Sequence, residues 1–182
     1  MAFFKQSKFS NIPAIIKSTF LSLCLVCTTF SIALYAQVGS GPGFEQPRAI
    51  ALEPDGNYVV ADEGLAAVIR VDQVTGNRTI VSDANTGAGQ LFKSLVGIEL
   101  SPNGSIWVID HDLKAVLEVN PITGDRTIVS NDTTGTGPAL DAPAGITDLF
   151  GSMLVGDGSA LAVFSISGSS GNRSIISGPN KG

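Results

Sequence analysis

Apolar and polar positions in this chain follow a pattern that repeats about every 48 residues. Each repeat has a short apolar segment, a turn, a nearly unbroken apolar run ending in Asp, an alternating segment, and a last segment rich in β-branched residues. Unbroken runs indicate strands buried on both faces, and alternation indicates a strand with two different faces. The pattern predicts four strands per repeat and no helix in residues 37–182.

The repeats are clearest at their last segments. These read TGNRTIVS at 75–82, TGDRTIVS at 123–130 and SGNRSIIS at 170–177. Arg78 and Arg126 are 48 positions apart, and Arg126 and Arg173 are 47 apart, because the third repeat has a shorter turn at Phe150-Gly151. A repeat of this length indicates a solenoid or a propeller, since one unit cannot bury its own apolar face.

The predicted fold is all-β, with three four-stranded β-propeller blades at about 44–90, 91–138 and 139–182. The β-prism is the alternative, because it also has three four-stranded sheets. The second strands, at 58–62, 106–110 and 153–157, are apolar on both faces, and this favours stacked blades.

Closed propellers have about 4 to 8 blades, so three blades make an incomplete propeller. Two explanations are open: the chain is a truncated part of a longer six-bladed protein, or two copies complete a six-bladed ring. Residues 178–182 resemble the start of another Gly-rich crossover, and this favours truncation.

The first 36 residues differ from the rest. Lys5, Lys8 and Lys17 precede an uncharged apolar run at 20–36, the order of a secretory signal peptide. We expect cleavage after Ala36, with an uncleaved anchor as the alternative. The domain division is therefore 1–36 and 37–182, and the predicted location is secreted or periplasmic, with no membrane contact after cleavage.

Composition excludes several kinds of functional site. Cys24 and Cys27 both lie in the predicted signal, so residues 37–182 contain no disulfide, thiol nucleophile or Cys-ligated zinc. The same residues carry 8 basic and 16 acidic side chains. A net charge of −8 repels phosphate backbones, so we expect no nucleic-acid binding.

Two charged positions recur in every repeat. The acids are Asp62, Asp110 and Asp157, and the arginines are Arg78, Arg126 and Arg173. The acids could form a cation-binding ring and the arginines an anion-binding rim. We favour structural roles for both sets, the acids capping turns and the arginines joining blades, because a repeated residue must suit a repeated environment.

His111 is the only histidine, and it lies between Asp110 and Asp112. An unrepeated loop residue of this kind is a candidate ligand or general base, although a solvated loop histidine is the preferred interpretation. A single histidine excludes His-rich metal sites. The sequence has no Gly-x-Ser-x-Gly motif and no phosphate-binding loop.

The segment PRAIALEPDGNYVVAD at 47–62 resembles the blade signature of NHL-repeat and related TolB-like six-bladed propellers, as do residues 95–110 and 143–157. Enzymes of this fold include gluconolactonase/regucalcin-type lactonases and streptogramin lyases. The lactonase resemblance implies metal ligands at the inner strands, and Glu45 matches its Glu-x-Pro position. Arg48, Val96 and Ala144 stand where the resemblance implies further ligands or a lyase histidine.

The sequence therefore predicts an exported, non-catalytic propeller module that binds a protein, small-molecule or glycan ligand on its loops. The alternatives are a degenerate metal-dependent lactonase- or lyase-type enzyme and a lectin-like carbohydrate-binding assembly. No cofactor is expected. If a divalent cation such as calcium binds, Glu45, Asp110 and His111 are the candidate ligands.

Overall fold

The computed structural model describes residues 38–179. The predicted signal peptide, its cleavage site and the last part of the predicted crossover at 178–182 lie outside these residues. Within the described part of the chain, no helix is long and apolar enough to cross a membrane.

The described residues form three four-stranded antiparallel sheets, each with its strands in chain order. The first sheet has β1 (Pro47–Leu52), β2 (Tyr58–Asp62), β3 (Ala67–Val71) and β4 (Arg78–Ser82); the second has β5 (Leu95–Leu100), β6 (Ile106–Asp110), β7 (Ala115–Val119) and β8 (Arg126–Ser130); the third has β9 (Pro143–Leu149), β10 (Ser152–Asp157), β11 (Ala162–Ser167) and β12 (Arg173–Ser177). The all-β prediction with three four-stranded units is confirmed.

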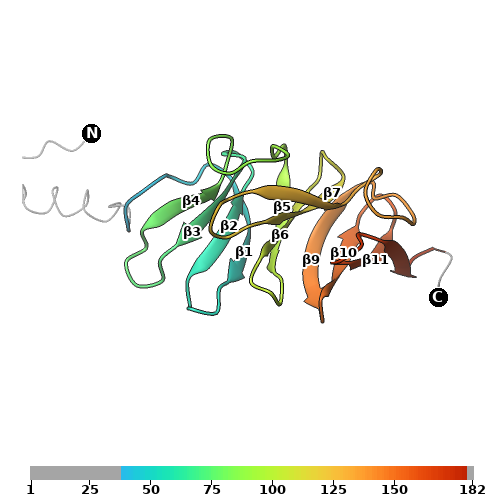
Figure 1. Ribbon diagram of the computed structural model, residues 1–182. Helices are drawn as coiled ribbons and strands as arrows, with labels where there is room; N and C mark the ends of the chain where they lie inside the picture. Colours follow the sequence, from blue (N-terminus) through green and yellow to red (C-terminus); the bar gives the residue numbers. More distant parts are fainter. Residues whose placement is uncertain (1–37, 180–182) are drawn as a thin grey trace, which may run out of the picture. The chain divides into compact units, whose positions relative to one another are not determined.

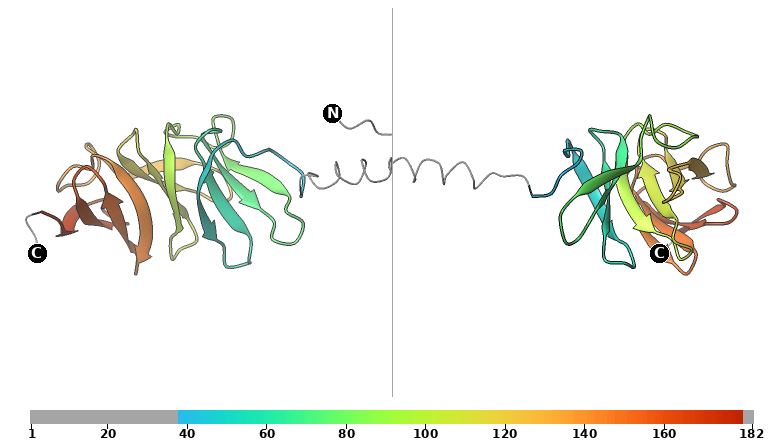
Figure 2. Two further views of the ribbon diagram at one scale, coloured as in Figure 1. Left: turned by 180° about the vertical axis from the view of Figure 1, so that it is seen from behind. Right: turned by 60° about the vertical axis from the view of Figure 1, so that its left-hand side comes forward.

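The sheets stack face to face in chain order, with β5 beside β1 and β9 beside β5 (Figures 1 and 2). One core fills the space between the first two sheets, where Val59 and Val68 meet Val108 and Leu117. A second core fills the space between the last two, where Trp107 meets Met153 and Phe164, among others. Stacking of this kind is that of propeller blades and not of a β-prism, because β6 contributes to a core on each face.

Each sheet is joined to the next by a Gly-rich crossover that pairs with the outermost strand of the sheet it enters. The backbone N–H of Arg126 donates to the carbonyl of Ala88 over 2.7 Å, and that of Arg173 to the carbonyl of Thr136 over 2.7 Å. The segment before the first sheet follows the same course, since Arg78 donates to the carbonyl of Ser40 over 2.7 Å. Residues 39–46 therefore have the conformation of a crossover.

The first strand of each sheet contains a break in its pairing register. In β1 the break lies between Pro47 and Ala49, and in β5 between Leu95 and Gly97. Bulges turn a side chain away from the regular ladder and often lie beside functional sites. Arg48, in the first break, lies at the same edge of the sheet as the turn after β2.

Candidate functional site

The repeated acids hold together the edge of each sheet at the end of its second strand. The carboxylate of Asp62 accepts backbone N–H bonds from Glu45, Gln46 and Leu65. Those of Asp110 and Asp157 accept equivalent bonds: Asp110 from Lys93, Ser94 and Leu113, and Asp157 from Asp141, Ala142, Ser159 and Ala160. Each acid thus ties the segment entering the sheet to the turn that leaves its second strand.

At Asp157 these backbone donors also change the pKa of the carboxyl group. Burial acts to raise the pKa of Asp157, but hydrogen bonds from four backbone N–H groups outweigh it and lower the pKa below its ordinary value. The turn that follows each acid contains a residue in the left-handed region: Ala66 at φ 47°, Lys114 at φ 49° and Leu161 at φ 50°. Such a conformation is costly for a non-glycine residue, so the carboxylate bonds stabilise a strained turn.

The repeated arginines bind crossover backbone. Arg126 donates to the carbonyls of Asp83 (2.7 Å) and Gln90 (2.7 Å), and its guanidinium lies over the ring of Phe92. Arg173 donates in the same way to Asn131 and Pro138, each over 2.7 Å. Arg78 donates to the carbonyl of Pro42 over 2.6 Å. The three side chains are buried and directed at backbone carbonyls.

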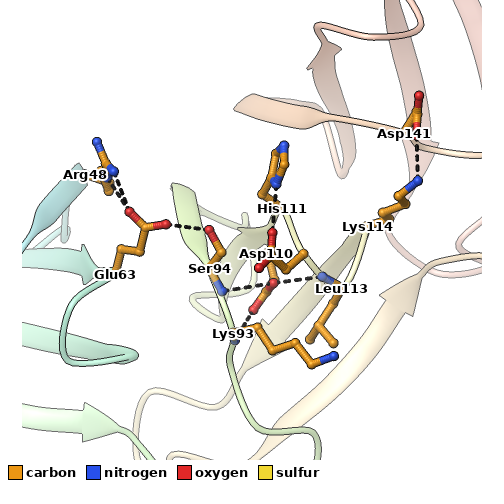
Figure 3. Close-up of polar contacts among 10 residues, drawn as sticks. Arg48, Glu63, Lys93, Ser94, Asp110, His111, Leu113, Lys114 and Asp141 are labelled. Atoms are coloured by element: carbon orange, nitrogen blue, oxygen red, sulfur yellow. Dashed lines mark hydrogen bonds and ion pairs between the residues drawn. The ribbon is translucent and has the colours of Figure 1, made fainter.

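Residues that change from repeat to repeat gather at the edge formed by the turns after β2, β6 and β10. Glu63 forms an ion pair with Arg48 over 2.6 Å, and Ser94 of the second sheet donates its hydroxyl to Glu63 over 2.5 Å (Figure 3). The hydrogen bond from Ser94, followed by that from Arg48, lowers the pKa of Glu63. This network links the first and second sheets.

A second polar link joins the second and third sheets. The ammonium group of Lys114 lies 2.6 Å from the carboxylate of Asp141, and this hydrogen bond raises the pKa of Lys114 (Figure 3). His111 lies at the same edge, with its Nδ1 3.1 Å from Asp112 and about half of its side chain exposed. We call this surface the charged edge; it comprises Arg48, Glu63, Ser94, His111, Asp112, Lys114 and Asp141.

The three candidate metal ligands do not form one cluster. Asp110 is buried and bonded to backbone N–H groups, and the ring of His111 faces Asp112. Glu45 is exposed before the first sheet, where its backbone N–H donates to Asp62. Among the described residues, no three side chains of His, Cys, Asp or Glu are placed to hold a metal ion together.

Glu63, Ser94, Lys114 and Asp141 are not among the predicted site residues. A signal was available at Glu63, because the position after the repeated acid is Glu63, His111 or Gly158 in the three repeats. Their pairing across sheets had no such signal, since it depends on how the sheets stack. Arg70 and Glu53 are also absent from the predicted site; they bind each other over 2.6 Å within the first sheet, at its opposite edge.

No protein-family model matches this sequence, and a comparison with curated protein sequences finds no match either. The fold is similar to six-bladed β-propellers of known structure. A nidogen/laminin complex contains one with a TM-score of 0.60 at 18% identity, covering 74% of this chain and 49% of that chain.

Two structures of virginiamycin B lyase from Staphylococcus aureus are also similar. The first has a TM-score of 0.60 at 17% identity, covering 78% of this chain and 45% of the lyase. The second, a catalytically inactive variant with quinupristin, has a TM-score of 0.56 at 19% identity, covering 74% of this chain and 42% of the lyase. The chain therefore spans less than half the length of these proteins, and the likeness concerns the fold alone.

Proposed function

We propose that this protein is an exported, non-catalytic binding module of the propeller class, related to NHL-repeat and TolB-like propellers, and that its charged edge binds another protein. The observation that carries this proposal is a difference between the charged residues that recur in every repeat and those that do not. Those that recur in every repeat are bonded to backbone inside the fold, whereas a group of those that differ between repeats forms ion pairs along one edge.

The composition of the charged edge favours a protein partner. Positive and negative side chains lie along it on the first sheet, the second sheet and the crossover into the third, and His111, Lys114 and Asp141 are substantially exposed. Complementary charges across an interface set specificity and association rate more than affinity. The nidogen/laminin complex offers a parallel, because a similar propeller there is part of an assembly of two proteins.

The test compares two charge reversals of equal size. The first is Asp112→Lys, because Asp112 lies in the charged edge. The second is Asp55→Lys, because Asp55 lies in the exposed turn between β1 and β2 at the opposite edge. Each variant of the full chain is immobilised and exposed to exported proteins of the source cells. We expect a protein retained by the unchanged chain and by Asp55→Lys, and an association rate of that protein with Asp112→Lys that is at least about tenfold lower. Equal behaviour of the two variants contradicts the proposal.

An enzyme of lyase or lactonase type is the second candidate. It is favoured by the similarity to virginiamycin B lyase and by the exposed pair of His111 and Asp112. Incubation with quinupristin, followed by mass spectrometry, tests the lyase. Calcium, manganese or zinc should raise the melting temperature if a metal site for a lactonase exists. An unchanged substrate excludes a lyase acting on quinupristin, and an unchanged melting temperature counts against a metal site for a lactonase. A glycan array tests the lectin-like alternative.

A further inference from the structure

We propose that two copies of this chain associate head to tail, with the outer face of the first sheet on the outer face of the third, and that the result is a closed ring of six blades. This inference is independent of the proposed function. It rests on a comparison of the same repeat positions in contacts made inside the chain and at its two outer faces.

Inside the chain, each sheet is covered by the next at a fixed set of positions. Val68 and Val116 are fully buried, and Ser82 and Ser130 are fully buried as well. The hydroxyl of Ser82 donates to the carbonyl of Gly124 in the following sheet over 2.7 Å, and that of Ser130 to Gly171 over 2.8 Å. Apolar contact and this hydroxyl bond are therefore features of each internal interface.

The third sheet presents the same positions uncovered. Val163 is 38% exposed and Ile176 is 50% exposed, whereas Val81 and Val129, which correspond to Ile176, are buried. Ser177, which corresponds to Ser82 and Ser130, is exposed. We call this surface the trailing face; it is hollowed along Gly145, Gly156, Val163 and Ser177.

The second sheet approaches the third closely at one glycine. A Cβ atom on Gly97 would lie 2.6 Å from the carbonyl of Ala144 in the third sheet, so this contact requires glycine. Ala49 holds the same position in the first sheet, so the contact between the first two sheets has room for a methyl group. Gly145 occupies the position in the third sheet, and a Cβ there would meet nothing within 4 Å. The trailing face therefore leaves room for a sheet at the distance of either internal contact.

The first sheet presents the opposite half of the interface, which we call the leading face. Ile50 is 63% exposed, whereas Ile98, its counterpart in the second sheet, is 5% exposed. Phe44 is 41% exposed, whereas its counterparts Phe92 and Leu140 are 8% and 2% exposed. Phe44 and Ile50 line a groove together with Tyr58, Val60 and Val71.

A second copy of the chain fits these two faces better than an unrelated partner. The leading face already has its crossover in place, because residues 39–46 follow the course of residues 87–94 and 135–142. Each copy supplies one leading face and one trailing face, so both are covered in a pair. A head-to-tail contact closes into a ring when the rotation per copy allows it, and three blades correspond to half a turn of a six-bladed propeller.

The first experiment measures the mass of the purified full chain by light scattering. We expect the mass of two copies, judged against the monomer mass from mass spectrometry of the same sample. Ile50→Glu on the leading face and Val163→Glu on the trailing face should each raise the Kd of the dimer more than about 30-fold, as loss of a central contact does. Val74→Glu and Ile122→Glu, at residues 86% and 91% exposed in turns, are the controls and should remain dimeric.

Cross-linking gives a readout that does not depend on stability. Ser94 and Glu63 touch across an internal interface, and Gln46 and Gly158 hold the corresponding positions on the outer faces. In a Cys24→Ser/Cys27→Ser background, a short bis-maleimide should link two copies of the double variant Gln46→Cys/Gly158→Cys and neither single variant. A monomer, an open filament, a dimer sensitive to only one face, or cross-linking by a single variant overturns the proposal.

Discussion

The guanidinium of Arg126 in β8 donates a 2.5 Å hydrogen bond to the hydroxyl of Ser82 at the end of β4, so a side chain of the second sheet holds the last strand of the first. Arg173 makes the same bond to Ser130 over 2.7 Å. The two residues of each pair lie more than forty positions apart in the sequence, 44 in the first pair and 43 in the second. Long-range contacts of this kind make the stability of neighbouring blades interdependent.

Replacing Arg126 with Lys should therefore destabilise the chain, because a lysine cannot reproduce the fork that reaches several acceptors at once. We expect a loss of about 2–3 kcal/mol, the usual effect of removing buried hydrogen bonds to a charged group. The measurement is urea unfolding at one protein concentration. Thr127→Ala, at the exposed neighbouring position of β8, is the control and should change the stability by less than about 1 kcal/mol. Equal effects of the two substitutions would contradict a structural role for Arg126.

Trp107 is the only tryptophan of the chain and lies in the core between the second and third sheets, with 4% of its surface exposed. Trp107→Ala should lower the free energy of unfolding by about 3–5 kcal/mol. Trp107→Phe should cost less, since it leaves a smaller cavity. In the unchanged protein, the fluorescence emission of Trp107 should be blue-shifted, and it should move to longer wavelength on unfolding. A Trp107→Ala variant of normal stability that loses ligand binding would instead show a recognition role.

The close contact between the second and third sheets at Gly97 should make stability sensitive to a side chain there. Comparison with a glycine outside the contact separates this effect from the general effect of replacing glycine. Gly97→Ala places a methyl group against a backbone carbonyl that cannot move freely, so we expect a loss of about 1–3 kcal/mol. Gly43→Ala is the matched control. A Cβ at Gly43 meets nothing within 4 Å, and Ala139 stands at the corresponding position of the third repeat. Chemical denaturation of both variants should show little change for Gly43→Ala.

Asp157 should make stability depend on pH in the acid range. Its pKa is lower in the folded chain than its ordinary value of 3.8, so the folded state favours the ionised carboxylate. This contribution is present above about pH 4 and is lost as the pH falls through the folded pKa. The stability difference between the unchanged chain and Asp157→Asn should therefore shrink between about pH 5 and pH 2. Asp132→Asn, an exposed crossover residue, is the control; a difference that stays constant with pH would count against the carboxylate's role.

The strands could be predicted closely because the repeat compares three versions of each element. Its last strands, predicted from the Arg-Thr-Ile-Val-Ser segments, coincide with β4 and β8 as observed. The first strands, expected from the apolar segments at 48–52, 96–100 and 144–149, begin one residue earlier, at Pro47, Leu95 and Pro143. Element ends are decided by local hydrogen bonds, and the side-chain pattern does not record them.

The candidate site was much harder to predict. Repetition identifies residues with a common environment, such as Asp110 and Arg126, and it says nothing about side chains that occur once. Glu63 and Ser94 are 31 positions apart and meet because the first two sheets stack. Lys114 and Asp141 meet for the same reason. Such pairs depend on how one blade packs on the next, and the sequence of a single repeat does not specify this packing.

The way Arg126 binds its crossover has a consequence for the integrity of the polypeptide. Its guanidinium contacts Asp83 and Thr86 on one side of Gly87 and Gln90 on the other. Both parts of the crossover are therefore fixed by the fold and not only by the peptide bonds between them. A cut at this loop would leave two fragments that can still recognise each other. The crossovers are therefore suitable places to split a propeller into separate chains or to introduce new termini by circular permutation.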